Sequence, residues 1–229
     1  MKSIIKIKNL NKSFGSKHIL KNVNFSVPEG TFVIFAGKNG SGKTTTIKNI
    51  LDLYSPDKDS LITINGIDSK KPKAREFVAY VPEKDNFSNE NAKNFLIRMG
   101  LLNNIPLDQL QTQIQKYVKL FEAEKYLNTR LDRLSSGNAK KFMIIQALLS
   151  NANCFIMDEP TDNLDPETRA AFYKLMKKLQ SEKKTIFISS HNLLEVGEYA
   201  DYAIIIADGE IKYTGKFKNS KDLLKLYGL

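Results

Sequence analysis

The segment GKNGSGKT, residues 37–44, has the residue types and spacing of a loop that binds phosphate groups. Its glycines let the main chain wrap closely around an anion, so that backbone N–H groups point at phosphate oxygens. Lys43 places a cation beside the outer phosphates, and the Thr44 hydroxyl can bind Mg²⁺. The apolar run FVIFA precedes the loop and a helical pattern follows it, which is the context that this motif requires. A nucleoside triphosphate is therefore the expected ligand.

A second group of reactive side chains ends two other apolar runs. Asp158 closes the run CFIM and can hold Mg²⁺ through water, and Glu159 follows it as a candidate general base. His191 closes the run TIFISS, whereas the other histidine, His18, has no such context. Because ligands of open α/β sheets bind at the carboxyl ends of the strands, we expect these groups to meet. The chemistry is hydrolysis or transfer of a phosphoryl group, and the phosphate-binding loop alone leaves kinases, GTPases and ATPases open.

The elements that must position these residues predict an α/β fold. Continuous apolar runs, typical of buried parallel strands, alternate with helical patterns. LITINGID and YAIIIADGEIKYTG each carry an Asn-Gly or Asp-Gly turn pair, which predicts antiparallel hairpins. We expect one domain over residues 1–229: a P-loop NTPase (RecA-like) core with a mainly parallel sheet and an antiparallel β subdomain in residues 1–84 and 151–229, and an inserted helical subdomain in about 85–150.

Composition narrows the function classes. The chain has 229 residues, 41% of them hydrophobic, and one cysteine, so a disulfide framework is excluded and a reducing compartment is expected. No apolar run is long enough to cross a membrane, so a membrane role requires a partner. The net charge of +10 is spread along the chain, and nucleic-acid binding is not expected.

Five segments, GKNGSGKT, YVPEKDNF, LSSGNAKK, FIMDEPTDNLD and IFISSHN, follow one another along the chain. Their residues and order resemble the nucleotide-binding domain of ABC transporters, and the resemblance covers essentially the whole chain. It implies that the chain binds and hydrolyses ATP with Mg²⁺. The roles that it implies are adenine stacking by Phe14, phosphate binding by Gly37, Asn39, Gly40, Ser41, Gly42, Lys43, Thr44 and Thr45, metal binding by Thr44, Glu83 and Asp158, and catalysis by Lys43, Glu83, Glu159 and His191.

The segment LSSGN, residues 134–138, is called the signature segment below. Ser135 and the backbone N–H groups around Gly137 stand at a predicted helix start, which favours an anion. The resemblance implies that Ser135 and Gly137 contact the ATP of a second subunit, and that Asp165 supports the interface of a head-to-tail homodimer or heterodimer. It also implies a separate membrane-spanning partner, and hence a cytoplasmic location on the inner face of the cell membrane.

Three positions depart from the family pattern: Ser136 replaces a glycine, Asn138 a glutamine, and Glu83 a glutamine. If the backbone at position 136 needs a positive φ, serine costs about 1 kcal/mol or more there. Glutamate at the position of Glu83 is shared with ATPases of drug and bacteriocin exporters, so export is the expected direction. An importer ATPase, an ABC-type ATPase of cell division or cofactor assembly, and a small-molecule kinase are the alternatives; the kinase leaves LSSGN, DNLD and His191 unexplained.

Overall fold

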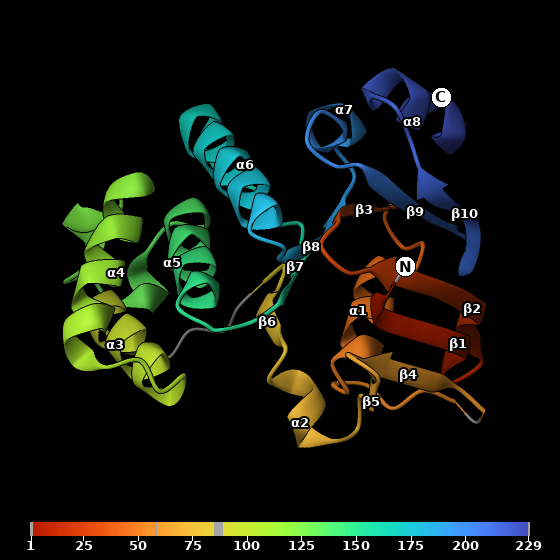
Figure 1. The fold of residues 1–229 in the computed structure, drawn as a ribbon, viewed down its shortest axis with the longest axis horizontal. Coiled ribbons are helices and arrows are strands. Elements are labelled where there is room, and N and C mark those ends of the chain that lie inside the picture. Colours follow the sequence, from red (N-terminus) through yellow and green to blue (C-terminus); the bar gives the residue numbers. More distant parts are fainter. Residues whose placement is uncertain (1, 58, 85–88, 229) are drawn as a thin grey trace.

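The structure is a computed structural model that describes residues 2–57, 59–84 and 89–228, and these residues form two β-sheets with helices around them (Figure 1). The strands are β1 (Ser3–Phe14), β2 (Lys17–Pro28), β3 (Phe32–Ala36), β4 (Leu61–Ile64), β5 (Ile67–Asp68), β6 (Val78–Val81), β7 (Cys154–Asp158), β8 (Thr185–Ser190), β9 (Tyr202–Ala207) and β10 (Glu210–Lys216). The α-helices are α1 (Lys43–Ile50), α2 (Pro72–Arg75), α3 (Ala92–Leu102), α4 (Leu107–Leu120), α5 (Ser136–Leu148), α6 (Pro166–Ser181), α7 (Leu193–Gly197) and α8 (Ser220–Tyr227), and short 3₁₀ turns are η1 (Glu124–Tyr126) and η2 (Leu131–Arg133).

The larger sheet has the strand order β10-β9-β3-β8-β7-β6, and its neighbours are parallel except for the β9–β10 hairpin. Every residue of β3, β7 and β8 is buried. Burial on both faces is the reason that these strands read as continuous apolar runs rather than as alternating patterns. The carboxyl ends of β3, β7 and β8 lie at one edge of the sheet, and the segments that follow them carry the predicted phosphate loop, Glu159 and His191.

The smaller sheet is antiparallel, with the strand order β2-β1-β4-β5. An apolar core that includes Ile47 and Ile50 of α1 lies between the two sheets. The turn at Asn65-Gly66 has φ values of 49° and 78°, and the turn at Asp208-Gly209 has 52° and 80°. Positive φ at both central residues is the geometry of a two-residue hairpin turn, so both predicted hairpins are confirmed.

Helices α3, α4 and α5 form a group at the opposite end of the molecule from the smaller sheet (Figure 1). Leu110, Ile114 and Val118 of α4, spaced four residues apart, are buried on one face of the helix, whereas Leu107, at the start of α4, is 50% exposed. The predicted boundary near residue 85 lies outside the described residues. The predicted fold class, with its parallel core, antiparallel sheet and helical group, is confirmed.

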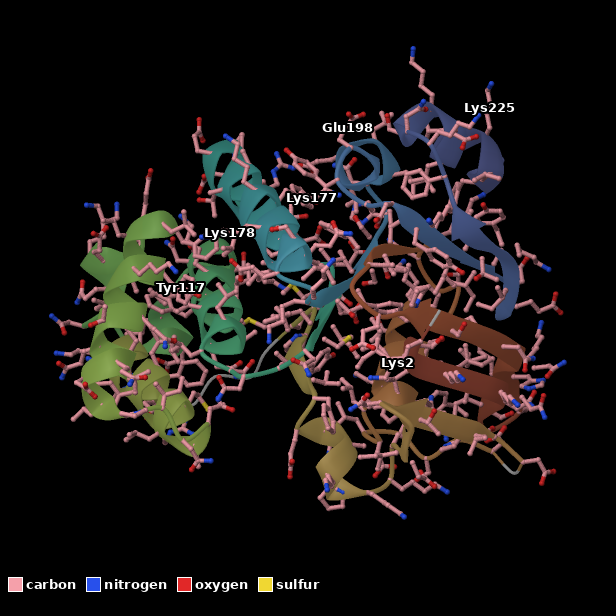
Figure 2. All side chains as sticks on the ribbon, in the orientation of Figure 1. Lys2, Tyr117, Lys177, Lys178, Glu198 and Lys225 are labelled. Atoms are coloured by element: carbon pink, nitrogen blue, oxygen red, sulfur yellow. The ribbon has the colours of Figure 1, made fainter. Side chains whose placement is uncertain are left out.

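Exposed lysines occur on separate parts of the surface. Figure 2 labels Lys2 near the N-terminus, Lys178 on α6 and Lys225 on α8, and all three side chains are exposed. These three lysines face the solvent, where lysine is an ordinary surface residue.

Candidate nucleotide-binding site

The phosphate loop, residues 37–44, connects β3 to α1 and is shaped by its glycines. A Cβ at Gly37 would collide with the Ser41 hydroxyl and lie 2.6 Å from the Ile206 carbonyl oxygen. Gly40 and Gly42 have φ values of 80° and 110°, and Gly42 is the N-cap of α1. Only glycine adopts such backbone conformations without strain. The loop thus needs its glycines for shape, and it presents the N-terminus of α1 to an anion.

A cavity of about 410 Å³ opens beside this loop. Its wall brings together residues that lie far apart in the sequence and that follow β3, β6, β7 and β8. The lining residues are Lys17, Ile19, Asn39, Gly40, Gly42, Lys43, Thr44, Thr45, Glu83, Glu159, Asp162 and His191. Phosphate-binding, acidic and histidine side chains predicted from the sequence therefore share one cavity.

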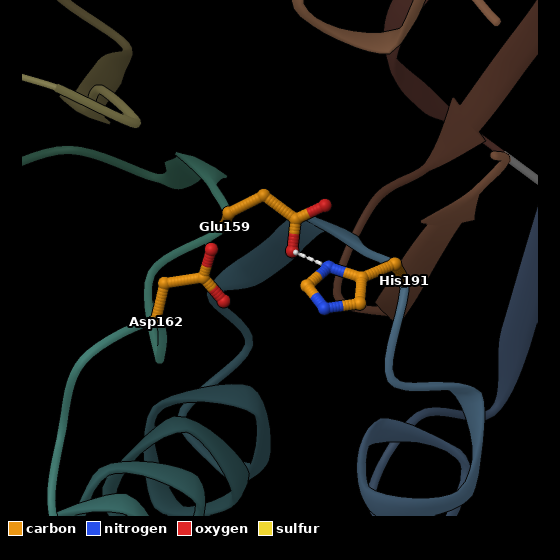
Figure 3. Close-up of side chains that lie close together, drawn as sticks. All are labelled: Glu159, Asp162 and His191. Carbon is orange, nitrogen blue, oxygen red and sulfur yellow. Dashed lines mark hydrogen bonds and ion pairs between the residues drawn. The ribbon is translucent and has the colours of Figure 1, made fainter. Parts of the chain in front are cut away.

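Glu159 is the centre of an ionic cluster in this cavity. Its carboxylate forms a hydrogen bond with His191 Nδ1 at 3.0 Å (Figure 3). Its Oε1 atom lies 3.6 Å from Lys43 Nζ. Burial raises the pKa of Glu159, the charges of Lys43 and His191 lower it, and the nearby Asp162 raises it. The net effect is a raised pKa, which suits a group that accepts a proton.

The backbone of Glu159 is held in an unusual conformation. Its φ is 45°, and its N–H donates to the carbonyl and hydroxyl oxygens of Ser189 at 3.2 and 3.1 Å. Positive φ at a residue other than glycine is rare and clusters at functional sites. Ser189 on β8 thereby fixes the turn that directs the Glu159 side chain into the cavity.

Asp158 is fully buried at the end of β7 and is not among the residues that line the cavity. Its Oδ1 atom accepts a short hydrogen bond from the Ser189 hydroxyl, while its Oδ2 atom is buried with no hydrogen-bond partner among the described residues. A buried carboxylate oxygen in that state fits a position that binds a cation through water. Thr44 and Glu83, the other two predicted Mg²⁺ ligands, both line the cavity.

A different trio, Glu159, Asp162 and His191, has ligand atoms within 4.8 Å of one another in the described part of the chain. The ammonium group of Lys43, 3.6 Å from Glu159, places a positive charge beside this trio. That charge disfavours a second cation there. We therefore interpret the trio as part of the ionic cluster around Glu159.

Phe14 lies at the end of β1 and is 46% exposed. Its ring packs edge-on against Tyr54, with 5.3 Å between ring centroids, and Lys12 Nζ lies 5.0 Å from its centroid. Phe14 is not among the residues that line the cavity, whereas Lys17 and Ile19 of β2 are. The role of Phe14 in stacking on adenine stays a prediction.

The signature segment begins helix α5, and none of its residues lines the cavity beside the phosphate loop. The Ser135 hydroxyl caps α5 by accepting from the Asn138 N–H at 3.4 Å. Neither Ser135 nor Gly137 lines the cavity that contains Lys43. A Cβ at Gly137 would collide with the carbonyl oxygen of Asn163, in the loop after β7. The chain therefore leaves these two residues apart from its own phosphate loop.

Ser136 does not have the positive φ that would make a serine costly at this position. Ser136 is the first residue of α5 and is not among the non-glycine residues with positive φ. A serine in the first turn of a helix costs little, because its hydroxyl is near unsatisfied backbone N–H groups. The conditional penalty predicted from the sequence is absent.

Asp165 begins helix α6 as its N-cap, with Pro166 at the first helical position. It accepts hydrogen bonds from the Thr168 N–H at 2.7 Å and the Thr168 hydroxyl at 2.8 Å, and it forms an ion pair with Lys141 at 3.2 Å. Burial raises the pKa of Asp165, but the bonds from Thr168 and Lys141 outweigh it and lower the pKa to about 2. Asp165 therefore joins the signature helix to the loop that follows Glu159.

Sequence reasoning missed four residues at the site: Asp162, Ser189, Lys140 and Lys141. Asp162 stands in the quoted segment DNLD and Ser189 two positions before His191, so their neighbours pointed to them. Lys140 and Lys141 are buried despite their charge, and a run of lysines gives no sign of burial.

A phosphate loop between a buried strand and a helix, with carboxylates and a histidine at adjacent strand ends, defines the site of a P-loop nucleotide hydrolase. The sequence profile of the ABC transporter family matches residues 20–162. The chain belongs to this family, as an ATPase subunit.

No helix among the described residues is long and apolar enough to span a membrane.

Several known proteins are similar over most of the chain. A Mycoplasma pneumoniae protein assigned to the ABC transporter ATP-binding proteins is 38% identical over 94% of this chain and 68% of its own length. The ABC transporter ATP-binding protein NatA of Bacillus subtilis is 31% identical over 87% of this chain and 82% of its own length. A solved ATP-binding subunit of an ABC transporter has a TM-score of 0.88 at 27% identity, over 99% of this chain and 95% of that one. A dimeric ATP-binding cassette bound to ADP and Pi has a TM-score of 0.83 at 25% identity, over 94% of this chain and 99% of that one.

Proposed function

We propose that the chain hydrolyses ATP with Mg²⁺ in a head-to-tail dimer and thereby powers transport by a separate membrane-spanning subunit. The observation that carries this proposal is the single cavity in which the phosphate loop, Glu83, Glu159 and His191 meet. The exclusion of Ser135 and Gly137 from that cavity supports the dimer, because a second chain can supply them. The similar cassette solved as a dimer with ADP and Pi supports it as well.

Each side chain of the cavity has a role in this proposal. The backbone of the phosphate loop and Lys43 bind the phosphates. Thr44, Glu83 and Asp158 would hold Mg²⁺, which neutralises charge on the phosphate oxygens when it is bound. Glu159 takes a proton from the attacking water, and its raised pKa supports that role. His191 contacts the γ-phosphate in this proposal, and its hydrogen bond with Glu159 at 3.0 Å supports a role beside the base.

The proposed direction of transport is export, and the partner is a membrane protein that holds the chain at the inner face of the membrane. Glu83 is the residue that supports export. The similar proteins include a Nod factor export protein of Cupriavidus metallidurans, 29% identical, and a zinc uptake protein of Listeria monocytogenes, 30% identical, so their names favour neither direction. Co-purification from native membranes should recover a membrane-spanning protein; a native complex without one would contradict transport.

The substitution Glu159→Gln tests the enzymatic part of the proposal. It preserves size and removes the base, so phosphate release should fall by roughly 10²-fold or more. The same variant should form an ATP-dependent dimer, detected by light scattering after gel filtration, because ATP is bound and not consumed. The matched control is Glu76→Gln, an exposed residue at the end of α2. Full activity in Glu159→Gln would exclude this residue as the base, and a monomer with ATP and Mg²⁺ would exclude the dimer.

A further inference from the structure

Two consecutive lysines attach helix α5 to two loops of the chain's own nucleotide site. Lys140 Nζ donates to the carbonyl oxygens of Pro82 at 2.9 Å and Glu83 at 2.7 Å. Lys141 Nζ pairs with Asp165 at 3.2 Å. The two lysines are 3% and 6% exposed, and α5 also packs against β6, the strand that leads to Glu83.

Packing alone does not account for a buried ammonium group at position 140. Removing a charge from water is costly unless hydrogen bonds replace the water. An apolar side chain would fill the same space without that cost, as Phe142 and Ile144 do elsewhere on α5. The hydrogen bonds of Lys140 with main-chain oxygens therefore indicate a role beyond filling the core.

The position of Lys140 on the helix connects two functional segments. Ser136 and Lys140 are four residues apart and lie on one face of α5, and both line a cavity of about 700 Å³ with Glu83 and Asp162. Glu83 and Asp162 also line the nucleotide cavity. Lys140 thus stands between the signature segment, which begins the same helix, and the backbone of a residue at the chain's own ATP site.

We infer that Lys140 is a positioning residue that couples the two ATP sites of the dimer. A hydrogen bond to the Glu83 carbonyl oxygen follows any movement of that main chain when nucleotide contacts the Glu83 side chain. Because α5 is a continuous helix, the movement reaches Ser135 and Gly137, which serve the ATP of the other subunit. This inference rests on the proposed function, since it needs ATP hydrolysis by a head-to-tail dimer.

Lys141 serves a different purpose in the same region. It contacts the side chain of Asp165, which is already fixed by its two hydrogen bonds with Thr168 at the start of α6. Because Asp165 is fixed, its ion pair with Lys141 anchors α5 and transmits little movement from the segment that contains Glu83. Loss of Lys141 should therefore weaken folding more than communication between the sites.

The ATP dependence of hydrolysis tests the coupling. The variants are Lys140→Gln, which removes the charge, and Lys140→Arg, which keeps it; Lys119→Gln, an exposed lysine on α4, is the control. The wild type and the control should show a Hill coefficient above 1. Lys140→Gln should show a Hill coefficient of 1, and its half-saturating ATP concentration should be raised about fivefold, which is the lower end of the usual range for coupled sites. Lys140→Arg, which keeps the positive charge, should retain a Hill coefficient above 1. Circular dichroism and thermal unfolding confirm that each variant is folded.

The same titration in the Glu159→Gln background follows ATP-dependent dimerisation without turnover. There, Lys140→Gln should make the transition less steep. A folded Lys140→Gln protein with wild-type steepness in both assays overturns the coupling and leaves the proposed ATPase intact. A wild type that hydrolyses ATP with a Hill coefficient of 1 also overturns the coupling. A wild type that releases no phosphate from ATP contradicts the proposed function itself.

Discussion

Glu159 is held between groups that shift its pKa in opposite directions. Burial raises the pKa most, Lys43 and His191 lower it, and Asp162 raises it again, so the pKa stands above the ordinary value of 4.5. A general base works only when deprotonated, so activity is lost as the pH falls through this pKa. The acid side of the profile of kcat/KM should therefore have its midpoint above that of an unperturbed glutamate.

Two substitutions should move this midpoint in opposite directions. His191→Ala removes a group that lowers the pKa of Glu159 and should shift the midpoint to higher pH. Asp162→Asn removes a group that raises it and should shift the midpoint to lower pH. The profile of kcat/KM, which reports the free enzyme, is the measurement, and His18→Ala is the control. Shifts in the same direction would show that the ionic cluster does not set the titration of the base.

At the level of secondary structure, Asp165 fixes the start of α6 and holds α5 beside it. Asp165→Ala should lower the free energy of unfolding by about 0.5–2 kcal/mol, the usual effect of losing an N-cap. The pKa of Asp165 is lowered from 3.8 to about 2 in the folded protein, so its contribution is complete above the unfolded value and is lost as the pH falls toward 2.

Chemical denaturation at several pH values measures this contribution. Asn219→Ala, which removes the cap of α8, is the matched control, because Asn219 accepts from the Asp222 N–H at 3.0 Å far along the chain from the site. Both variants should lose stability at neutral pH, and only Asp165→Ala should approach wild type in acid. ATPase activity should fall in Asp165→Ala alone. A difference from wild type that does not change with pH would contradict the ion-pairing role of Asp165.

Elements whose formation depends on local sequence could be predicted, and contacts between elements could not. The buried strands β3, β7 and β8 and the turns at Asn65-Gly66 and Asp208-Gly209 follow from apolar runs and from residues that tolerate positive φ. The hydrogen bonds of the buried Lys140 reach the carbonyl oxygens of Pro82 and Glu83, which are 58 and 57 residues away in the sequence, so the local sequence does not predict its burial. The φ at Ser136 likewise depends on where α5 begins.

In the whole molecule, the phosphate loop and the signature segment, the two parts of the proposed ATP site, do not line the same cavity. Lys43, Thr44, Glu159 and His191 share one cavity, while the signature segment begins α5, where Gly137 lies against the carbonyl oxygen of Asn163. The motifs predicted that all these residues act on ATP, and strand order predicted which of them meet. That Ser135 lies outside the cavity depends on the placement of α5 against β6, which no local pattern encodes.

Mixing two inactive variants tests whether each site combines residues of both chains. Lys43→Ala removes the phosphate-binding cation, and Ser135→Asp keeps a residue suited to the N-cap of α5 while placing a negative charge where the triphosphate of the other subunit is expected. Each variant alone should lose most of its ATPase activity, because both sites of its homodimer carry the defect. In a hybrid dimer, one site carries both defects and the other carries none, so a mixture should regain activity. Phosphate release from separate and mixed variants, at equal total concentration, measures this recovery. A mixture no more active than the average of its two components would contradict a site that works with Lys43 of one chain and Ser135 of the other.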